Sequence, residues 1–260
     1  MATPADVGRI DHRRVELLDI NVYASRAEAG AAAASVIEDL IVDRLASNDV
    51  VRIVFASAPS QLELLAALRA STRIAWARVV AFHMDEYVGL SADAPQCFSS
   101  FLRRELFEAA VPGAVNLIDP SDPLGECLRY ESKLREAPID LVCCGVGENG
   151  HLAFNEPGAS SFVDDRWVRV VPLTQESRQQ QLNDGCFASL SEVPSEAITV
   201  TIPALFSARH IVAVVPGSRK AAALSRVMHG PVDEGCPATI LRRHASAALF
   251  ADEAAFRPVR

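Results

Sequence analysis

Residues Ile139 to Gly158 read IDLVCCGVGENGHLAFNEPG, an apolar run followed by a polar, glycine-rich loop. The run that ends at Cys144 has the length and composition of a buried strand, so the loop should emerge at that strand's carboxyl end. Ligands bind at this end of open parallel sheets. The loop carries His151, which exchanges protons near neutral pH, and Glu156, a carboxylate able to orient it. The stretch therefore predicts a parallel sheet with a proton-handling site at its edge.

Strands and helices alternate along the rest of the chain. Apolar residues recur with helical spacing or form short β-branched runs, which predicts helices near residues 27–45, 62–68, 98–106, 124–134 and 218–228, and strands near residues 50–55, 78–82, 139–144, 167–171, 197–201, 210–215 and 247–250. This order predicts an α/β fold with a single doubly wound, mostly parallel sheet and helices on both faces, a modified Rossmann-like arrangement. No linker or repeat divides the sequence, so we expect residues 1–260 to form one domain.

Composition narrows the class of partner. Half of the 260 residues are hydrophobic and the formal charge is −8, which argues against a nucleic-acid partner or an anionic membrane surface. The sequence has no signal-peptide core and no membrane-length apolar run, which predicts a cytoplasmic protein without a membrane partner. The six cysteines show no CxxC spacing, so we expect neither a disulfide framework nor a zinc site.

Two loops after predicted strands carry groups suited to an anion. Ser57, Ser60 and Gln61 lead from the strand near residues 50–55 into a helix, although a plain turn with a helix cap explains them equally well. After residue 215, Ser218 is a natural N-cap and Lys220 lies in the first helical turn. Free backbone N–H groups, the positive helix end and the lysine form a seat for phosphate, and an ordinary capped helix is the alternative.

The loop after residues 78–82 is dense in ionisable groups. His83, Asp85, Glu86 and Tyr87 place four titratable side chains in five positions, which favours a functional site over a solvated strand end. His83 with Asp85 and Glu86 could bind a metal, but no second ligand pair has matching spacing. We therefore expect neither a metal nor a cofactor.

The segment from Gly145 to Gly150 satisfies G-x-G-x-x-G, the dinucleotide-binding fingerprint. That fingerprint requires a helix to begin within the glycines, whereas residues 155–158 (NEPG) break any helix within two turns. We therefore reject a dinucleotide site. A half-buried structural histidine is the alternative for His151, and the neighbouring Asn149, Asn155 and Glu156 favour the functional interpretation.

Three stretches resemble the glucosamine-6-phosphate deaminase (isomerase) family, whose superfamily includes 6-phosphogluconolactonase. They are residues 82–90 (FHMDEYVGL), 145–157 and 214–221 (VVPGSRKA), and their order and separations fit over nearly the whole chain. Residues 85–90 and 155–157 are more similar to the deaminase branch. The resemblance implies a metal-free aldose–ketose isomerisation coupled to loss of ammonia from an amino-sugar phosphate, in amino-sugar catabolism. Related enzymes are often oligomeric, so a homo-oligomer is compatible with it.

The resemblance also implies residue roles. His151 would assist ring opening, with Glu156 holding its tautomer, and Asp85 would move a proton from C2 to C1 of the sugar. Lys220, with the loop that carries Ser57, Ser60 and Gln61, would hold the phosphate.

The sequence departs from the family pattern at three places. Asn149 stands where the family usually has an aspartate; it can accept a hydrogen bond from an imidazole but supplies no charge. In the loop 57–61 (SAPSQ), Pro59 removes one backbone donor. The segment 179–185 (QQQLNDG) lacks the family's phosphate-binding arginine, for which Arg178, one helical turn earlier, is the candidate substitute. Three functions stay open: a deaminase/isomerase for glucosamine 6-phosphate or a close analogue, a sugar lactone hydrolase with His151 as its base, and a non-catalytic sugar-phosphate sensor.

Overall fold

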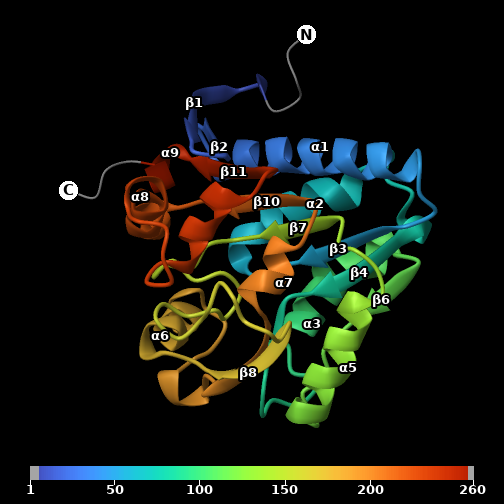
Figure 1. The fold of residues 1–260 in the computed structure, drawn as a ribbon, viewed down its shortest axis with the longest axis vertical. Helices are drawn as coiled ribbons and strands as arrows, with labels where there is room; N and C mark the ends of the chain where they lie inside the picture. Colours follow the sequence, from blue (N-terminus) through green and yellow to red (C-terminus); the bar gives the residue numbers. More distant parts are fainter. Residues whose placement is uncertain (1–5, 257–260) are drawn as a thin grey trace.

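A mostly parallel sheet forms the centre of the molecule in the computed structural model, which describes residues 6–256 (Figure 1). Its strand order is β1-β2-β11-β10-β7-β3-β4-β6. β1 runs antiparallel to β2, and every other neighbouring pair is parallel. The α/β class predicted from the sequence is confirmed. The strands are β1 Arg9–Val15, β2 Leu18–Tyr23, β3 Val51–Phe55, β4 Val79–His83, β6 Ala114–Asn116, β7 Leu141–Cys144, β10 His210–Val215 and β11 Ala247–Asp252.

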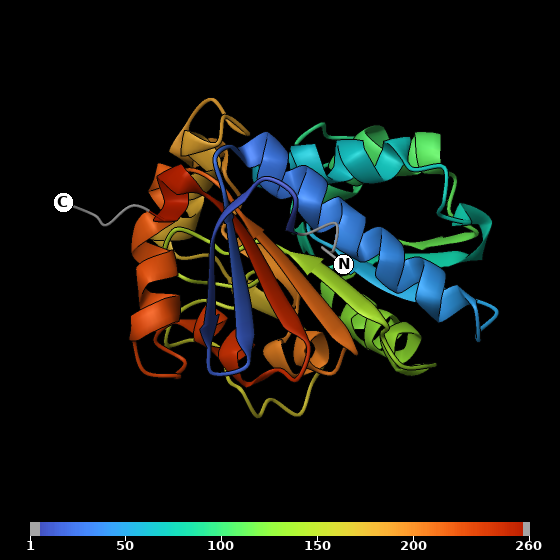
Figure 2. The same ribbon diagram turned by 90° about the horizontal axis from the view of Figure 1, so that it is seen from above.

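Helices cover both faces of this sheet, as predicted. Figure 2 shows α1, in blue, on one side and α5 and α8, in green and orange, on the other. Neighbouring strand residues point to opposite faces, so Ile53 packs in one apolar core and Val54 in the other. One face carries α1 Arg26–Leu45, α2 Leu62–Ala70, α3 Phe98–Leu102, its π-helical continuation Arg103–Phe107 and α4 Glu108–Ala110; the other carries α5 Pro123–Arg135, α7 Ile202–Phe206, α8 Ala221–His229 and α9 Glu253–Phe256. Within residues 6–256, no helix has both the length and the hydropathy needed to cross a bilayer.

The alanine-rich start of α1 has a packing reason. Ser25 caps the helix, and its side chain and backbone exchange hydrogen bonds with Glu28 in a capping box. A Cβ atom on Gly30 would lie 2.7 Å from the Cβ of Glu63, so α1 and α2 approach closely here. Small side chains in this run therefore permit the contact between the two helices.

A second, three-stranded antiparallel sheet lies beside the main one, in the order β5-β9-β8. β5 is Asp85–Tyr87, β8 is Val168–Pro172 and β9 is Glu196–Val200. The expectation of a single sheet was wrong for the strands near residues 167–171 and 197–201. β8 is half exposed, which suits a small antiparallel sheet better than a parallel sheet covered on both faces. β5 follows β4 after one residue, Met84, and this change of sheet turns Asp85 toward the edge of the main sheet.

The strand order reverses between β3 and β7. From β3 the chain adds β4 and β6 on one side, and from β7 it adds β10 and β11 on the other. At such a switch point the loops after the two central strands diverge and leave a crevice at the carboxyl edge. The loops after β3, β4, β7 and β10 all reach this edge.

Candidate active site

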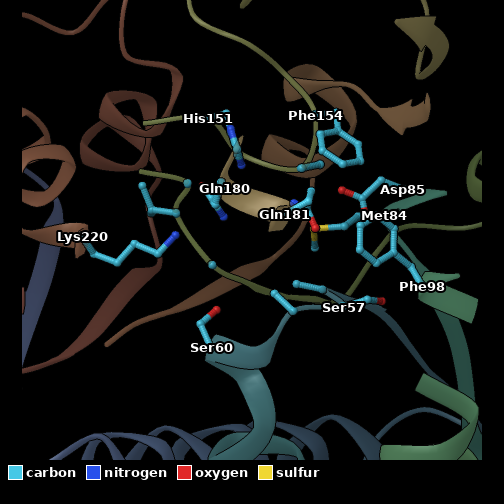
Figure 3. A pocket seen from close by; sticks show the side chains of 16 residues that line it. Ser57, Ser60, Met84, Asp85, Phe98, His151, Phe154, Gln180, Gln181 and Lys220 are labelled. Atoms are coloured by element: carbon cyan, nitrogen blue, oxygen red, sulfur yellow. The ribbon is translucent and has the colours of Figure 1, made fainter. Parts of the chain in front are cut away.

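Four strand ends and two helices surround one pocket at the switch point (Figure 3). The prediction that the loops after successive strands converge is confirmed. The lining residues are Ala56, Ser57, Ala58 and Ser60 after β3; Met84 and Asp85 after β4; Gly145, Val146, Gly147, His151, Ala153 and Phe154 after β7; Lys220 after β10; Phe98 from α3; and Gln180 and Gln181 from α6 (Gln175–Asn183).

The glycines after β7 let the loop wrap around an imidazole. A Cβ atom on Gly147 would lie 2.2 Å from Nε2 of His151, and Gly150 has a φ of +92°. The N–H of Gly147 donates to the carbonyl of His151 at 2.9 Å. No helix begins anywhere in residues 145–158, so these glycines serve the histidine and do not form a dinucleotide turn.

His151 is 7% exposed, and its nearest side-chain partner is a hydroxyl. Its Nδ1 lies 3.0 Å from Oγ of Ser177 and 3.7 Å from Oε2 of Glu156. The second distance is too long for a hydrogen bond. The role of Glu156 in holding the tautomer of His151 stays a prediction, and α6 places Ser177 closer to the ring than this carboxylate.

Asn149 contacts the backbone of His151 instead of its imidazole. Its Oδ1 accepts the backbone N–H of His151 at 3.1 Å, and its Nδ2 donates to Oε2 of Glu156 at 2.9 Å. Burial alone would raise the pKa of Glu156. The nearby imidazole and the donor groups of Ser177 and Asn149 outweigh burial and hold that pKa below its ordinary value. The buried Glu156 is thus a carboxylate at neutral pH.

Asp85 brings a second carboxyl group to the pocket, and Figure 3 shows it pointing into the cavity. It is 7% exposed. Burial, reinforced by the charge of Glu86, raises its pKa well above the ordinary value. A carboxyl group with a strongly raised pKa in a cleft is suited to proton transfer.

Two other ionisable groups of this strand end, Glu86 and His83, bind backbone N–H groups. Glu86 accepts backbone N–H groups of Tyr87 and Phe98 at 3.0 Å and thereby anchors the start of α3. His83 is fully buried, and its Nε2 accepts the N–H of Ile118 at 3.4 Å. Burial, reinforced by a nearby arginine, lowers the pKa of His83 to about 3. Among residues 6–256, no three His, Cys, Asp or Glu side chains form a cluster that could hold a metal ion.

The pocket lining includes three residues expected to bind phosphate, Lys220, Ser57 and Ser60. Lys220 is 7% exposed, and burial lowers its pKa although the carboxylates of Asp184 and Glu148 oppose the shift. The Ser57 hydroxyl is buried without a protein hydrogen bond in the described part of the chain.

Two expectations about these anion loops need correction. Gln61 does not line the pocket; its Nε2 donates to Ser60 Oγ and to the carbonyl of Val214, both at 3.1 Å, and so ties the loop to β10. Ser218 is not the N-cap of α8: a 3-10 turn, Ser218–Lys220, precedes this helix, and Lys220 occupies its N-cap position.

Arg178 is not brought to the pocket. Its guanidinium donates to the carbonyls of Leu190 and Val193, at 2.8 and 2.9 Å, and holds the loop after α6. A second arginine near the site, Arg219, forms ion pairs with Glu148 and Asp184 at 3.3 and 2.8 Å and does not line the cavity either. Among the pocket-lining residues, Lys220 is therefore the only cation.

The buried face of α6 is polar along its whole length. Its buried residues are Ser177, Gln180 and Gln181, spaced at i, i+3 and i+4, where a packed helix normally presents an apolar stripe. Gln180 accepts the backbone N–H of Glu148 at 2.9 Å, and Figure 3 shows Gln180 and Gln181 among the side chains of the cavity. The helix thus lines a polar site in place of packing against a core.

Residues 24–250 of the chain match the family described as "Glucosamine-6-phosphate isomerases/6-phosphogluconolactonase". The chain belongs to this family. A glucosamine-6-phosphate deaminase from Exiguobacterium sibiricum is 40% identical over 185 residues, which cover 70% of this chain and 71% of the relative. The deaminase of the same name from Bacillus cereus is 35% identical over 206 residues, covering 77% and 75%.

Solved structures of family members have the same fold. A monomeric glucosamine-6-phosphate deaminase superposes with a TM-score of 0.82 at 25% identity, over 91% of this chain and 98% of that protein. A 6-phosphogluconolactonase from Thermotoga maritima superposes with a TM-score of 0.73 at 20% identity, over 91% and 100%, which is a likeness of fold alone. The two branches of the family thus share this architecture, and the chain's own side chains must distinguish between them.

Sequence reasoning missed the contributions of Ser177, Gln180 and Gln181 to this family site. A signal was available, because residues 175–183 contain an i, i+3, i+4 set of polar side chains and no apolar stripe. That pattern is also typical of an exposed helix. Only the position of α6 against the loop after β7 separates the two interpretations.

Proposed function

We propose that the chain is an amino-sugar-phosphate deaminase/isomerase that converts glucosamine 6-phosphate, or a close analogue, into fructose 6-phosphate and ammonia. The observation that carries the proposal is the pairing of a buried carboxyl group, Asp85, with a buried imidazole, His151, in one cavity whose other end holds Lys220. This set supplies an acid–base group for each proton transfer and a cation for the phosphate. The relatives named as glucosamine-6-phosphate deaminases support the same reaction.

In the proposed mechanism His151 opens the sugar ring. Its Nε2 takes the proton of the anomeric hydroxyl and returns it to the ring oxygen as the bond from C1 to that oxygen breaks. The imidazolium formed between these steps lies near the Glu156 carboxylate, whose charge stabilises it. The histidine begins and ends the step neutral.

Asp85 then carries out the isomerisation. Its ionised carboxylate takes the proton from C2 of the open-chain aldehyde while the substrate's ammonium group passes one proton to the aldehyde oxygen, which gives a neutral enolamine. The Asp85 carboxyl group then delivers its proton to C1. The product is an iminium at C2, and water adds to it and expels ammonia as ammonium. The raised pKa of Asp85 favours its protonated form in the free protein. The substrate's ammonium group at C2 would favour the ionised form by charge attraction.

The proposed phosphate site is weaker than the family pattern implies. Lys220 and the hydroxyls of Ser57 and Ser60 would bind the phosphate, with no arginine among the lining residues. Losing one charge-assisted hydrogen bond weakens binding by roughly 1.5–3 kcal/mol. This is enough to alter the choice among sugar phosphates without abolishing the site.

The test mixes the protein with glucosamine 6-phosphate and with its epimeric amino-sugar phosphates, and follows ammonia and ketose phosphate. We expect turnover of at least one of them, and a loss of about 100- to 10,000-fold in kcat for Asp85→Asn. The matched control is Asp165→Asn, the same chemical change at a side chain that is 86% exposed and remote from the pocket. Turnover that survives Asp85→Asn would contradict the assignment.

Lactone hydrolysis is the second candidate, because His151 could activate water without help from Asp85 and the lactonases have this fold. It predicts hydrolysis of a sugar phosphate lactone that tolerates Asp85→Asn. A non-catalytic sensor predicts that sugar phosphates raise the Tm without turnover of any compound in the panel. Turnover of any compound that is lost in His151→Ala would contradict the sensor hypothesis.

We further propose that residues 1–260 act as one catalytic domain in the cytoplasm, with a small sugar phosphate as its partner. The six cysteines are all free thiols, five of them buried, which fits a reducing compartment. The formal charge of −8 gives no support to a nucleic-acid partner.

A further inference from the structure

Ser177 lies where the first turn of α6 meets the imidazole of His151. Thr174 caps the helix and accepts the backbone N–H of Ser177 at 3.2 Å, so the Ser177 hydroxyl is not used by the helix end. The side chain is 1% exposed, and its Oγ lies 3.0 Å from Nδ1 of His151. Oε2 of Glu156 lies 3.7 Å from the same nitrogen. The Ser177 hydroxyl and the Glu156 carboxylate therefore both face Nδ1.

We propose that Ser177 is a positioning residue whose hydroxyl oxygen accepts the Nδ1–H of His151, and so fixes the tautomer that leaves Nε2 bare in the pocket. The inference rests on the proposed role of His151 as the ring-opening base. Ser177 does not touch the substrate and acts through the histidine.

The charge near Nδ1 sets the direction of this hydrogen bond. Oε2 of the ionised Glu156, 3.7 Å from Nδ1, favours a proton on that nitrogen over a bare lone pair. His151 then donates its Nδ1–H to the Ser177 oxygen, which has lone pairs to accept it. Asn149 donates to the same carboxylate oxygen at 2.9 Å and keeps Glu156 in place. His151 protonated on Nδ1, with Nε2 bare, is the protonation pattern that fits these neighbours.

This pattern has a consequence for the ring-opening step. Nε2 accepts the anomeric proton and gives it back to the ring oxygen, while the proton on Nδ1 stays where it is. The imidazolium keeps its hydrogen bond to the Ser177 hydroxyl, and the charge of Glu156, 3.7 Å from Nδ1, stabilises it. No proton needs to pass through Ser177.

The first measurement compares the kinetics of Ser177→Ala and Ser177→Thr. Alanine keeps the helix but removes the hydroxyl, so kcat should fall roughly 10- to 100-fold while KM changes little. Threonine keeps the hydroxyl and should restore kcat to within a few-fold. Ser191→Ala is the matched control, because that exposed hydroxyl contacts only Ser189, outside the pocket. Wild-type kcat in Ser177→Ala would overturn the proposal.

The second measurement reads the tautomer without substrate, by 15N NMR of histidine-labelled protein, with the His151→Gln spectrum identifying the signal. The wild type and Ser177→Thr should show a protonated Nδ1 and a bare Nε2. Ser177→Ala should shift the population toward a protonated Nε2. An unchanged tautomer refutes the role of Ser177 even if turnover is present, whereas absence of turnover in the wild type refutes only the proposed function. If Ser177→Ala does not fold, Ser177→Cys fills the same space with a weaker hydrogen bond and should give the same shift in part.

Discussion

Replacing Asn149 by aspartate would restore the family's usual residue, yet the surrounding contacts predict a loss. The Nδ2 atom of Asn149 donates to Oε2 of Glu156 at 2.9 Å. In Asn149→Asp a carboxylate oxygen takes the place of that donor. Two unit charges at this separation repel by about 6 kcal/mol at an effective dielectric constant of about 20. The pair will avoid this by holding one proton near neutral pH, which removes part of the negative charge that faces His151.

The sign of the pH dependence follows from this repulsion. The variant's carboxyl pair binds a proton more tightly in the folded protein than in the unfolded chain, so the cost grows as the pH rises. At about pH 8 we expect a loss of about 3–5 kcal/mol in unfolding free energy, or about 6–20 °C in Tm, and a smaller loss at lower pH. kcat should fall at least about tenfold at pH 8.

Thermal unfolding and steady-state kinetics between about pH 5.5 and 8.5 test this prediction. Asn183→Asp is the matched control, because that exposed side chain only accepts a hydrogen bond from Gln179 and a carboxylate can do the same. A Tm difference that does not change with pH, or a rise in kcat in Asn149→Asp, would refute the reasoning.

Three further predictions concern the remaining charged groups. Because burial raises the pKa of Asp85, kcat/KM should begin to fall with decreasing pH while the pH is still well above the ordinary carboxyl range, as a pH–rate profile would show. Asp85→Asn should also gain stability over the wild type as the pH rises through that pKa, as curves of Tm against pH would show. Lys220→Met should raise KM roughly 10- to 100-fold and abolish any rise in Tm caused by inorganic phosphate, measured by kinetics and thermal shift. Arg178→Ala should lower the unfolding free energy by about 1–3 kcal/mol in a denaturant titration and leave KM unchanged, since its guanidinium holds backbone carbonyls away from the pocket.

The parts of the fold that the sequence could predict are those encoded by local periodicity. The apolar runs of β3, β7 and β10 and the helical spacing of α1 each identify one element without reference to its partner. The second sheet could not be predicted in this way. β9 pairs with β5 across more than a hundred residues, and its sequence does not say which strand it will join.

The residues of the site also differ in whether local sequence could predict them. Asp85, His151 and Lys220 follow strands directly, so their place at the sheet edge could be predicted from the strands. Ser177 and Gln181 come from α6, which follows β8 of the second sheet and no strand of the main sheet. Arg178 faces away because a rotation of about 100° per residue separates it from Ser177. The sequence spacing predicted that Arg178 would lie near the pocket, but the helix face turns Ser177 toward the site and Arg178 away from it.

Two of the three departures from the family pattern compensate each other in charge. An asparagine at position 149 removes one negative charge, and the missing arginine removes one positive charge, so the net charge near the substrate is unchanged. We therefore expect a substrate that carries both an ammonium group and a phosphate still to suit the pocket, whose lining includes the neutral amides of Gln180 and Gln181. Amides such as that of Gln181 distinguish hydroxyl groups by direction, and a site built to hydrogen-bond a hydroxyl strongly rejects an analogue that lacks it or misplaces it. Gln181→Leu should consequently narrow the difference in kcat/KM between epimeric amino-sugar phosphates, and an unchanged ratio would show that the discrimination lies elsewhere in the pocket.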